Sequence, residues 1–109
     1  SEEIANGRAV LAEALSLLDA GVPIYAGTDA GGFLPHGLVG EEIAALAQFS
    51  SAEYALGAGS WRARDWLGHP STLIDGAPAD LVIFDADPRV DLDVLRAPRF
   101  VILRGALVN

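Results

Sequence analysis

Residues 22–28, VPIYAGT, are the segment that most limits how this chain can fold. The segment is apolar at both odd and even positions, whereas a half-exposed strand alternates apolar and polar side chains. A strand that is apolar on both faces is typical of a parallel sheet covered by helices on each side. Such a strand needs neighbouring strands of the same kind, and this sequence contains only one. We therefore expect the neighbours to lie outside these 109 residues.

The composition agrees with that expectation. Hydrophobic residues make up 51% of the sequence, which is high for a domain of this size, because a small domain has a large surface relative to its volume. The sequence also lacks Met and starts at Ser1. We expect the chain to be a fragment or processed part of a longer protein.

Charge and missing residue types exclude several classes of function. The net charge is −8, with seven Arg and no Lys, so a nucleic-acid partner is not expected. Without Lys these residues contain no P-loop and no Schiff-base lysine, and without Cys they contain no disulfide and no thiolate metal site. The longest apolar segment is short and carries Glu13 and Asp19. We therefore expect no membrane span. A cytoplasmic location, which the absence of Cys allows, is expected.

Three helices are expected from apolar periodicity and from capping residues. They cover residues 2–20, 39–49 and 51–68, and Gly21 is placed as the residue that ends the first of them. Within the third, Gly57 and Gly59 divide the helix into two short pieces, and Gly68 ends it. Ser50 and Ser51 can both cap its start, and Ser50 with Glu53 has the spacing of a capping box.

The second part of the sequence predicts β-structure. Residues 81–85 (LVIFD) and 100–108 (FVILRGALV) are rich in Val, Ile and Phe and are expected to form strands, with a bend at Gly105. The loop between them holds one helical turn. We therefore expect an α/β part at residues 1–68 and a β part at residues 69–109.

Asp29 is the main candidate site residue, because it follows the apolar segment directly. In parallel α/β proteins chemistry collects at the C-terminal ends of strands, so Asp29 could be a metal ligand or a general base. From position alone, a turn or cap role for an Asp in this place is at least as good an explanation. His36 lies between Pro35 and Gly37 and is by itself an ordinary loop histidine. His69 is assigned no catalytic role.

Other acidic residues have structural explanations. Glu41 and Glu42 suit the N-terminus of a helix, where the dipole favours negative charge. The DADP sequence at residues 85–88, with Asp91 and Asp93 after it, is acidic enough to suggest calcium. It lacks the glycine and the final Glu of an EF-hand loop, so a solvated loop is the better interpretation.

Two stretches resemble the metal-dependent amidohydrolases, especially the branch related to imidazolonepropionase and Xaa-Pro dipeptidases. The first, AGVPIYAGTDAGG…PHG…EEIAAL, resembles the last barrel strand of that family and the loop after it. The second, GAPADLVIFDADPRVDLDVLRAPRFVILRGALV, resembles the C-terminal end. The resemblance covers nearly the whole chain, and the two motifs in this order and at this separation are strongly specific.

The resemblance implies a fold and a metal site. It implies that the chain is the C-terminal segment of a (β/α)8 TIM barrel, namely its last helix-strand-helix units, followed by part of a small β-sandwich built from both chain ends. The family's metal ligands are an H-x-H pair, a carboxylated Lys or a Glu, two further histidines and an Asp after the eighth strand. Only the last has a counterpart here, which is Asp29. His36 lies in the loop that borders the substrate in this family.

The implied activity is hydrolysis of a C–N bond in a cyclic amide or peptide-like small molecule. One or two divalent metal ions, commonly zinc, would activate a water molecule, and Asp29 would bind metal and transfer the proton. The fragment alone is expected to be inactive and to self-associate. The alternative is a stand-alone, non-catalytic α/β module that binds a partner through apolar surface. An H-x-H pair upstream in a longer reading frame would decide between them.

Overall fold

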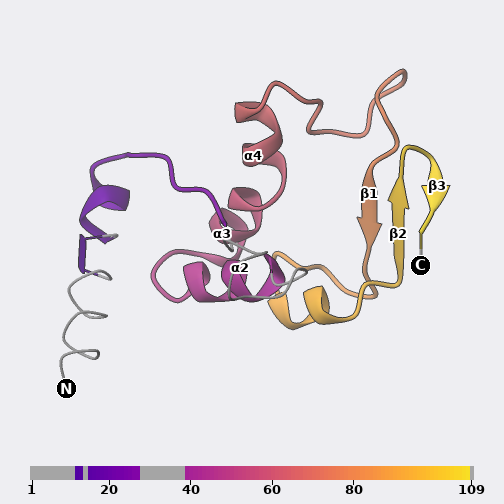
Figure 1. Cartoon of the computed structure of the whole chain (residues 1–109). Coiled ribbons are helices and arrows are strands. Elements are labelled where there is room, and N and C mark those ends of the chain that lie inside the picture. The colour runs from indigo at the N-terminus through magenta and orange to yellow at the C-terminus, as the bar shows by residue number, and fades with distance from the viewer. Residues whose placement is uncertain (1–11, 14, 28–38, 109) are drawn as a thin grey trace, which may run out of the picture.

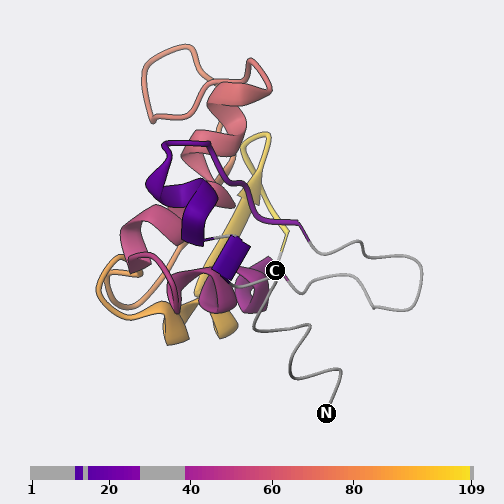
Figure 2. The same ribbon diagram turned by 90° about the vertical axis from the view of Figure 1, so that its left-hand side faces the viewer.

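The computed structural model describes residues 12–13, 15–27 and 39–108 (Figure 1). The chain has an α/β fold in which helices come first and a three-stranded antiparallel sheet follows. Figure 1 shows the helices α2, α3 and α4 in the middle, with the N-terminal helical residues on one side and the sheet on the other. In the view of Figure 2 the N-terminal helical residues face the viewer and the sheet lies behind them.

The N-terminal helix ends as its sequence predicts. Residues 12–13 and 15–19 are helical, and Gly21 follows with φ +81°. The N–H of Val22 donates to the carbonyl of Leu17 (3.0 Å), and the N–H of Gly21 donates to that of Leu18 (3.1 Å). This pair of hydrogen bonds is a Schellman motif, for which glycine is the favoured residue. The rest of the predicted helix, residues 2–11 and 14, lies outside the described residues.

The prediction of a strand at residues 22–28 is wrong for residues 22–27, because the structure assigns them to no strand. Thr28 lies outside the described residues. The physical reason for the wrong prediction is that a strand exists only through hydrogen bonds to another strand, and none of the described residues forms a strand beside this segment. Its backbone groups bond instead to α3 and α4, as described below for the site.

The next elements are α2 (Val39–Ala47), α3 (Ala52–Ala58) and α4 (Trp61–Trp66). Ser51 caps α3, because its hydroxyl accepts a hydrogen bond from the N–H of Tyr54 at 3.0 Å. The prediction of a Ser50–Glu53 capping box is therefore wrong. The Ser50 hydroxyl instead donates to the carbonyl of Leu46 at 2.8 Å, which also accepts from the N–H of Phe49 at 3.3 Å at the end of α2.

The predicted division of the third helix is confirmed. Gly59 is the C-cap of α3, and α4 begins two residues later. A side chain at Gly59 would meet packed neighbours, since an added Cβ would lie 2.7 Å from Cδ1 of Ile43. Gly68 (φ +80°) ends α4 in a second Schellman motif, in which the N–H of His69 donates to the carbonyl of Arg64 at 2.9 Å.

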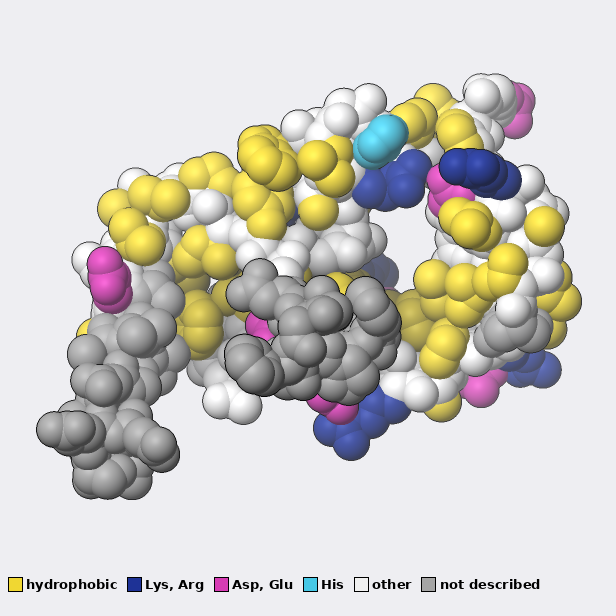
Figure 3. Space-filling view, viewed as in Figure 1, with side chains coloured by type: hydrophobic (Ala, Val, Ile, Leu, Met, Phe, Trp, Pro, Cys, Tyr) yellow, Lys and Arg dark blue, Asp and Glu magenta, His cyan; other side chains and the backbone are white. Residues whose placement is uncertain are grey.

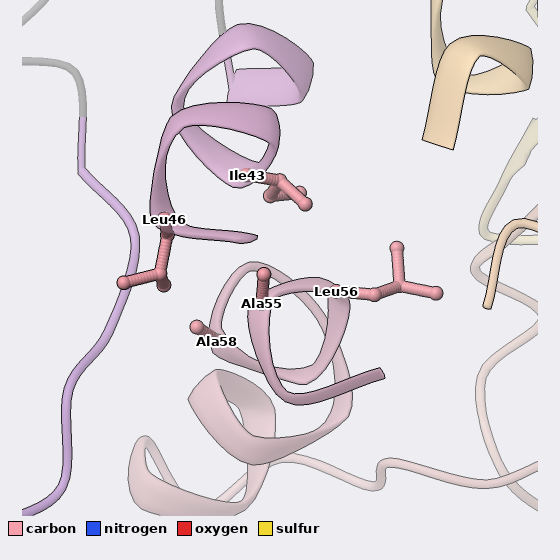
Figure 4. Packing of buried hydrophobic residues seen from close by; sticks show 5 residues of the cluster. All are labelled: Ile43, Leu46, Ala55, Leu56 and Ala58. Atoms are coloured by element: carbon pink, nitrogen blue, oxygen red, sulfur yellow. The ribbon is translucent and has the colours of Figure 1, made fainter. Parts of the chain in front are cut away.

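The hydrophobic core lies between α2 and α3 (Figure 4). Its buried members are Ile43, Leu46, Ala55, Leu56 and Ala58. Ala55 and Ala58 have no exposed surface, and their small side chains let the two helices approach closely. Partly buried side chains surround this core cluster: Ile24, Ala26, Ala47, Phe49, Trp61, Leu92 and Leu95.

The sheet has the order β1 (Leu81–Ile83), β2 (Phe100–Leu103), β3 (Ala106–Leu107). It confirms β-structure in both predicted regions, although β1 ends two residues earlier than expected. Arg104 and Gly105 both have positive φ (51° and 79°) between β2 and β3, which is the geometry of a two-residue type I′ hairpin turn. The bend predicted at Gly105 is thus confirmed.

The 3-10 helix η1 (Leu92–Arg96) is the helical turn expected between the strands. Asp91 caps it by accepting a hydrogen bond from the N–H of Asp93 at 3.0 Å. Leu92 and Leu95 of η1 pack against the core cluster. One element of residues 69–109 therefore packs against the core formed by α2 and α3. The boundary between residues 68 and 69 stays a prediction.

Much of the apolar surface of the described residues is exposed. In the sheet, Leu103 and Leu107 are 54% and 60% exposed, and in α4 Trp66 is 70% exposed. No helix in the described ranges is long and apolar enough to cross a membrane. The exposed sheet side chains lack a covering layer among the described residues, which agrees with the high hydrophobic content.

Candidate functional site

Asp29 and His36, the two predicted site residues, lie in residues 28–38, outside the described part of the chain. Their roles therefore stay predictions. The residues on either side are described: Gly27 ends the segment 22–27, and Val39 begins α2. Ile24 and Ala26 pack against the core cluster to which α2 contributes. His69, which was given no role, is exposed beyond the end of α4.

Three hydrogen bonds hold the segment that leads into Asp29. The N–H of Ile24 donates to the hydroxyl of Tyr54 at 3.2 Å, and Nη1 of Arg62 donates to the carbonyl of Ile24 at 3.2 Å. The N–H of Ala26 donates to the carbonyl of Ala58 at 3.1 Å. These bonds join residues 24–26 to α3 and α4, so the position of this segment depends on side chains thirty or more residues later.

The Arg62 guanidinium is surrounded by aromatic rings. It lies 3.9 Å from the ring centroid of Tyr54 and 5.6 Å from that of Tyr25, and the Tyr25 ring stacks on Trp66 with centroids 5.3 Å apart. None of the ion pairs found among the described residues involves Arg62. Ring faces, which attract cations through their quadrupole, therefore take the place of a carboxylate beside this charge.

Two hollows flank the helices. A cavity of about 580 Å³ lies beside the aromatic cluster and is lined by Tyr25, Tyr54, Arg62, Asp65 and Trp66, among others. A larger one, of about 1210 Å³, separates the helices from the sheet and is lined by Ile43, Leu56, Trp61, Leu81 and Val101, among others. Figure 3 shows this second gap, with hydrophobic side chains gathered on its sheet side. Both have mainly apolar walls.

Two carboxylates of the acidic loop pair with arginines. Asp87 is bound by Arg89, whose Nη2 lies 2.8 Å from Oδ2, and these hydrogen bonds lower the pKa of Asp87. Asp85 pairs with Arg99 at 2.8 Å. Among residues 12–13, 15–27 and 39–108, no three His, Cys, Asp or Glu side chains come together as metal ligands. The interpretation as a solvated loop stays a prediction.

Similar sequences come from mycobacteria. The chain is 52% identical over 88 residues to uncharacterized proteins of Mycobacterium tuberculosis and Mycobacterium bovis. The match covers 80% of this chain but 24% of those proteins. The chain thus spans about a quarter of the length of these relatives. No protein-family model matches it.

Solved structures resemble this fold over most of the chain. One is the crystal structure of a "putative prolidase" from Bifidobacterium longum, with a TM-score of 0.78 and 33% identity over 87% of this chain and 25% of that protein. Another, of an uncharacterized protein, has a TM-score of 0.75 and 27% identity over 89% of this chain and 26% of that one. The chain therefore has the fold of about a quarter of a larger protein, one example of which carries a hydrolase name.

Sequence reasoning missed Arg62 and Tyr54. Arg62 lies within the helix expected over residues 51–68, and its sequence context, WRARDW, shows no recognisable motif. The contacts join residues 38 and 30 positions apart, so no local pattern reports them. The sequence offered only a weak signal for this contact. A helix divided by Gly57 and Gly59 can bring Arg62 of the second piece over Tyr54 of the first.

Proposed function

We propose that this chain is the C-terminal portion of a metal-dependent amidohydrolase that hydrolyses a C–N bond in a cyclic amide or peptide-like small molecule. The observation that carries the proposal is the structural match to a quarter of the Bifidobacterium longum protein, at 33% identity and a TM-score of 0.78. The quarter-length match to the mycobacterial proteins supports the view that this unit occurs within longer chains. The TIM barrel and the β-sandwich shared by both chain ends belong to this proposal.

Asp29 is the residue that this chain would bring to the active site. Zinc, when bound, supplies a water molecule whose pKa is lowered enough for attack near neutral pH. Asp29 would be one of its ligands, would take the proton of the attacking water, and would pass it to the leaving nitrogen. The described residues offer no set of three ligands, and zinc sites need three or four. The other ligands would come from outside this chain.

His36 would have a secondary role in the same proposal. It follows Asp29 by seven residues in a sequence rich in glycine, which allows the chain to pass close to a bound molecule. We place it beside the substrate rather than on the metal. A variant that loses only such a contact changes KM more than kcat.

The proposal is tested by comparing the longer protein with the 109-residue chain. The longer protein should hold zinc and release free proline from Ala-Pro, or open a cyclic amide, and a chelator should abolish the activity. The 109-residue chain should show neither hydrolysis nor firmly bound zinc. Elemental analysis and an amino-acid release assay measure both properties. One firmly held zinc per short chain, or a zinc-free longer protein with no hydrolysis of either substrate class, would contradict the proposal.

We also propose that the 109-residue chain associates with itself. The three-stranded sheet has β1 and β3 as its edge strands. Exposed edges are templates for pairing with another chain. Trp66, the last residue of α4, and Leu67, its C-cap, are 70% and 61% exposed and add apolar surface. Light scattering over a concentration series should show a mass that rises above that of one chain. A constant monomer mass at the highest concentration would refute self-association.

A further inference from the structure

Three hydrogen bonds from α3 and α4 meet the backbone of residues 24–26. The N–H and carbonyl of Ile24 bond to Tyr54 and Arg62, and the N–H of Ala26 bonds to the carbonyl of Ala58. These two helices therefore hold the backbone of the segment at Ile24 and at Ala26.

We propose that Arg62 and Tyr54 are positioning residues, which fix the segment from which the chain continues into Thr28 and Asp29. The inference rests on the proposed function, because the role of Asp29 is taken from there. Neither residue is expected to touch substrate or metal. Each acts through the backbone of Ile24, five positions before Asp29.

The Arg62 side chain is suited to this role by its geometry. Its Nη1 donates to the carbonyl of Ile24 at 3.2 Å, while Nη2 donates to the carbonyl of Tyr54 at 2.8 Å. One planar group thus joins the segment to α3, and its stacking on the Tyr54 ring at 3.9 Å restricts its rotation. A lysine has a single ammonium on a flexible stem and cannot hold both carbonyls in the same fixed arrangement.

Hydrogen bonds give the segment a defined register, which packing alone does not. The apolar contacts of Ile24 and Ala26 with the core cluster are non-directional. A slip of one residue would move everything downstream by about 3.3 Å. Catalysis tolerates far less, since a displacement of about 1 Å can cost about 100-fold in rate. The directional bonds to Ile24 and Ala26 therefore matter for any group that follows them.

The first test measures these bonds directly, without reference to activity. Tyr54→Phe removes the hydroxyl that accepts from Ile24 and keeps the ring beneath Arg62. In the 109-residue chain, amide hydrogen exchange at Ile24 should become about 3- to 10-fold faster, the range expected for loss of one hydrogen bond. Exchange at Ala26 should change little. Tyr25→Phe is the matched control, because Tyr25 contacts Arg62 and Trp66 through its ring. An Ile24 amide that is unprotected in the wild type, or unchanged in Tyr54→Phe, would overturn the inference.

The second test uses the longer protein and Arg62→Lys, with Arg64→Lys as the matched control from the same helix. Arg64 bonds to the Pro70 carbonyl and pairs with Asp80 instead. With Ala-Pro as substrate, Arg62→Lys should lower kcat by about 10- to 100-fold, with KM within about threefold and zinc content unchanged. Arg64→Lys should retain wild-type kcat.

Normal kcat in Arg62→Lys, beside an inactive Asp29→Asn, would overturn the positioning role and leave the proposed function standing. An active Asp29→Asn would instead remove the proposed function, while the exchange result would still report the hydrogen bonds.

Discussion

Replacing Asp29 by Asn in the longer protein should lower kcat by about 10²- to 10⁴-fold, the usual worth of a positioned general base. Asn keeps the size of the side chain and one coordinating oxygen, but it loses the negative charge and the basicity. If Asp29 both binds metal and accepts the proton of water, the substitution removes the second role completely and weakens the first. Steady-state kinetics in zinc-saturated buffer measure the loss.

A thermal melt of the same variant separates chemistry from folding. Asp29 follows the segment 22–27, whose apolar contacts are made by Ile24 and Ala26, so the melting temperature should hardly change. His36→Ala is the contrasting variant, which should act mainly on KM. An Asp29→Asn protein with near-normal kcat, or one that fails to fold with zinc present, would return Asp29 to a turn or cap role.

Local signals in the sequence predicted most of the helical part. The cap at Gly21, the division of the third helix at Gly57 and Gly59, and the end at Gly68 all depend on the conformation of a few adjacent residues. The hairpin bend at Gly105 is local in the same sense. Where two local candidates competed, at Ser50 and Ser51, the pattern could not decide. The Ser50 hydroxyl is engaged by the carbonyl of Leu46 in the preceding helix.

The strand at residues 22–27 could not be predicted correctly, because strand formation depends on a partner. An apolar pattern reports burial, and Ile24 and Ala26 are indeed packed against the core cluster. Which groups meet the backbone is decided by residues far along the chain, here Tyr54, Ala58 and Arg62. The candidate site follows the same logic: a motif can point to Asp29, but the groups that hold its segment have no motif.

Leu46→Ala should strongly lower the stability of the 109-residue chain. Leu46 is 7% exposed and is one of three large side chains among the five buried members of the core cluster. Figure 4 shows its side chain directed to the side on which the segment 22–27 runs. Truncation of a buried leucine to alanine costs about 2–5 kcal/mol, since it removes apolar contacts and leaves a cavity.

The measurement is urea unfolding of the variant beside Leu73→Ala, which makes the same chemical change at a side chain that is 74% exposed. Leu73→Ala should shift the free energy of unfolding by no more than about 0.5 kcal/mol, as surface substitutions do. Domains of ordinary stability have about 5–15 kcal/mol in total, so Leu46→Ala should lower the urea midpoint clearly. Because Ile24 and Ala26 rest on the same cluster, amide exchange at Ala26 should also accelerate in this variant. Equal midpoints for the two variants would show that the contact between α2 and α3 is not the core that supports the segment leading to Asp29.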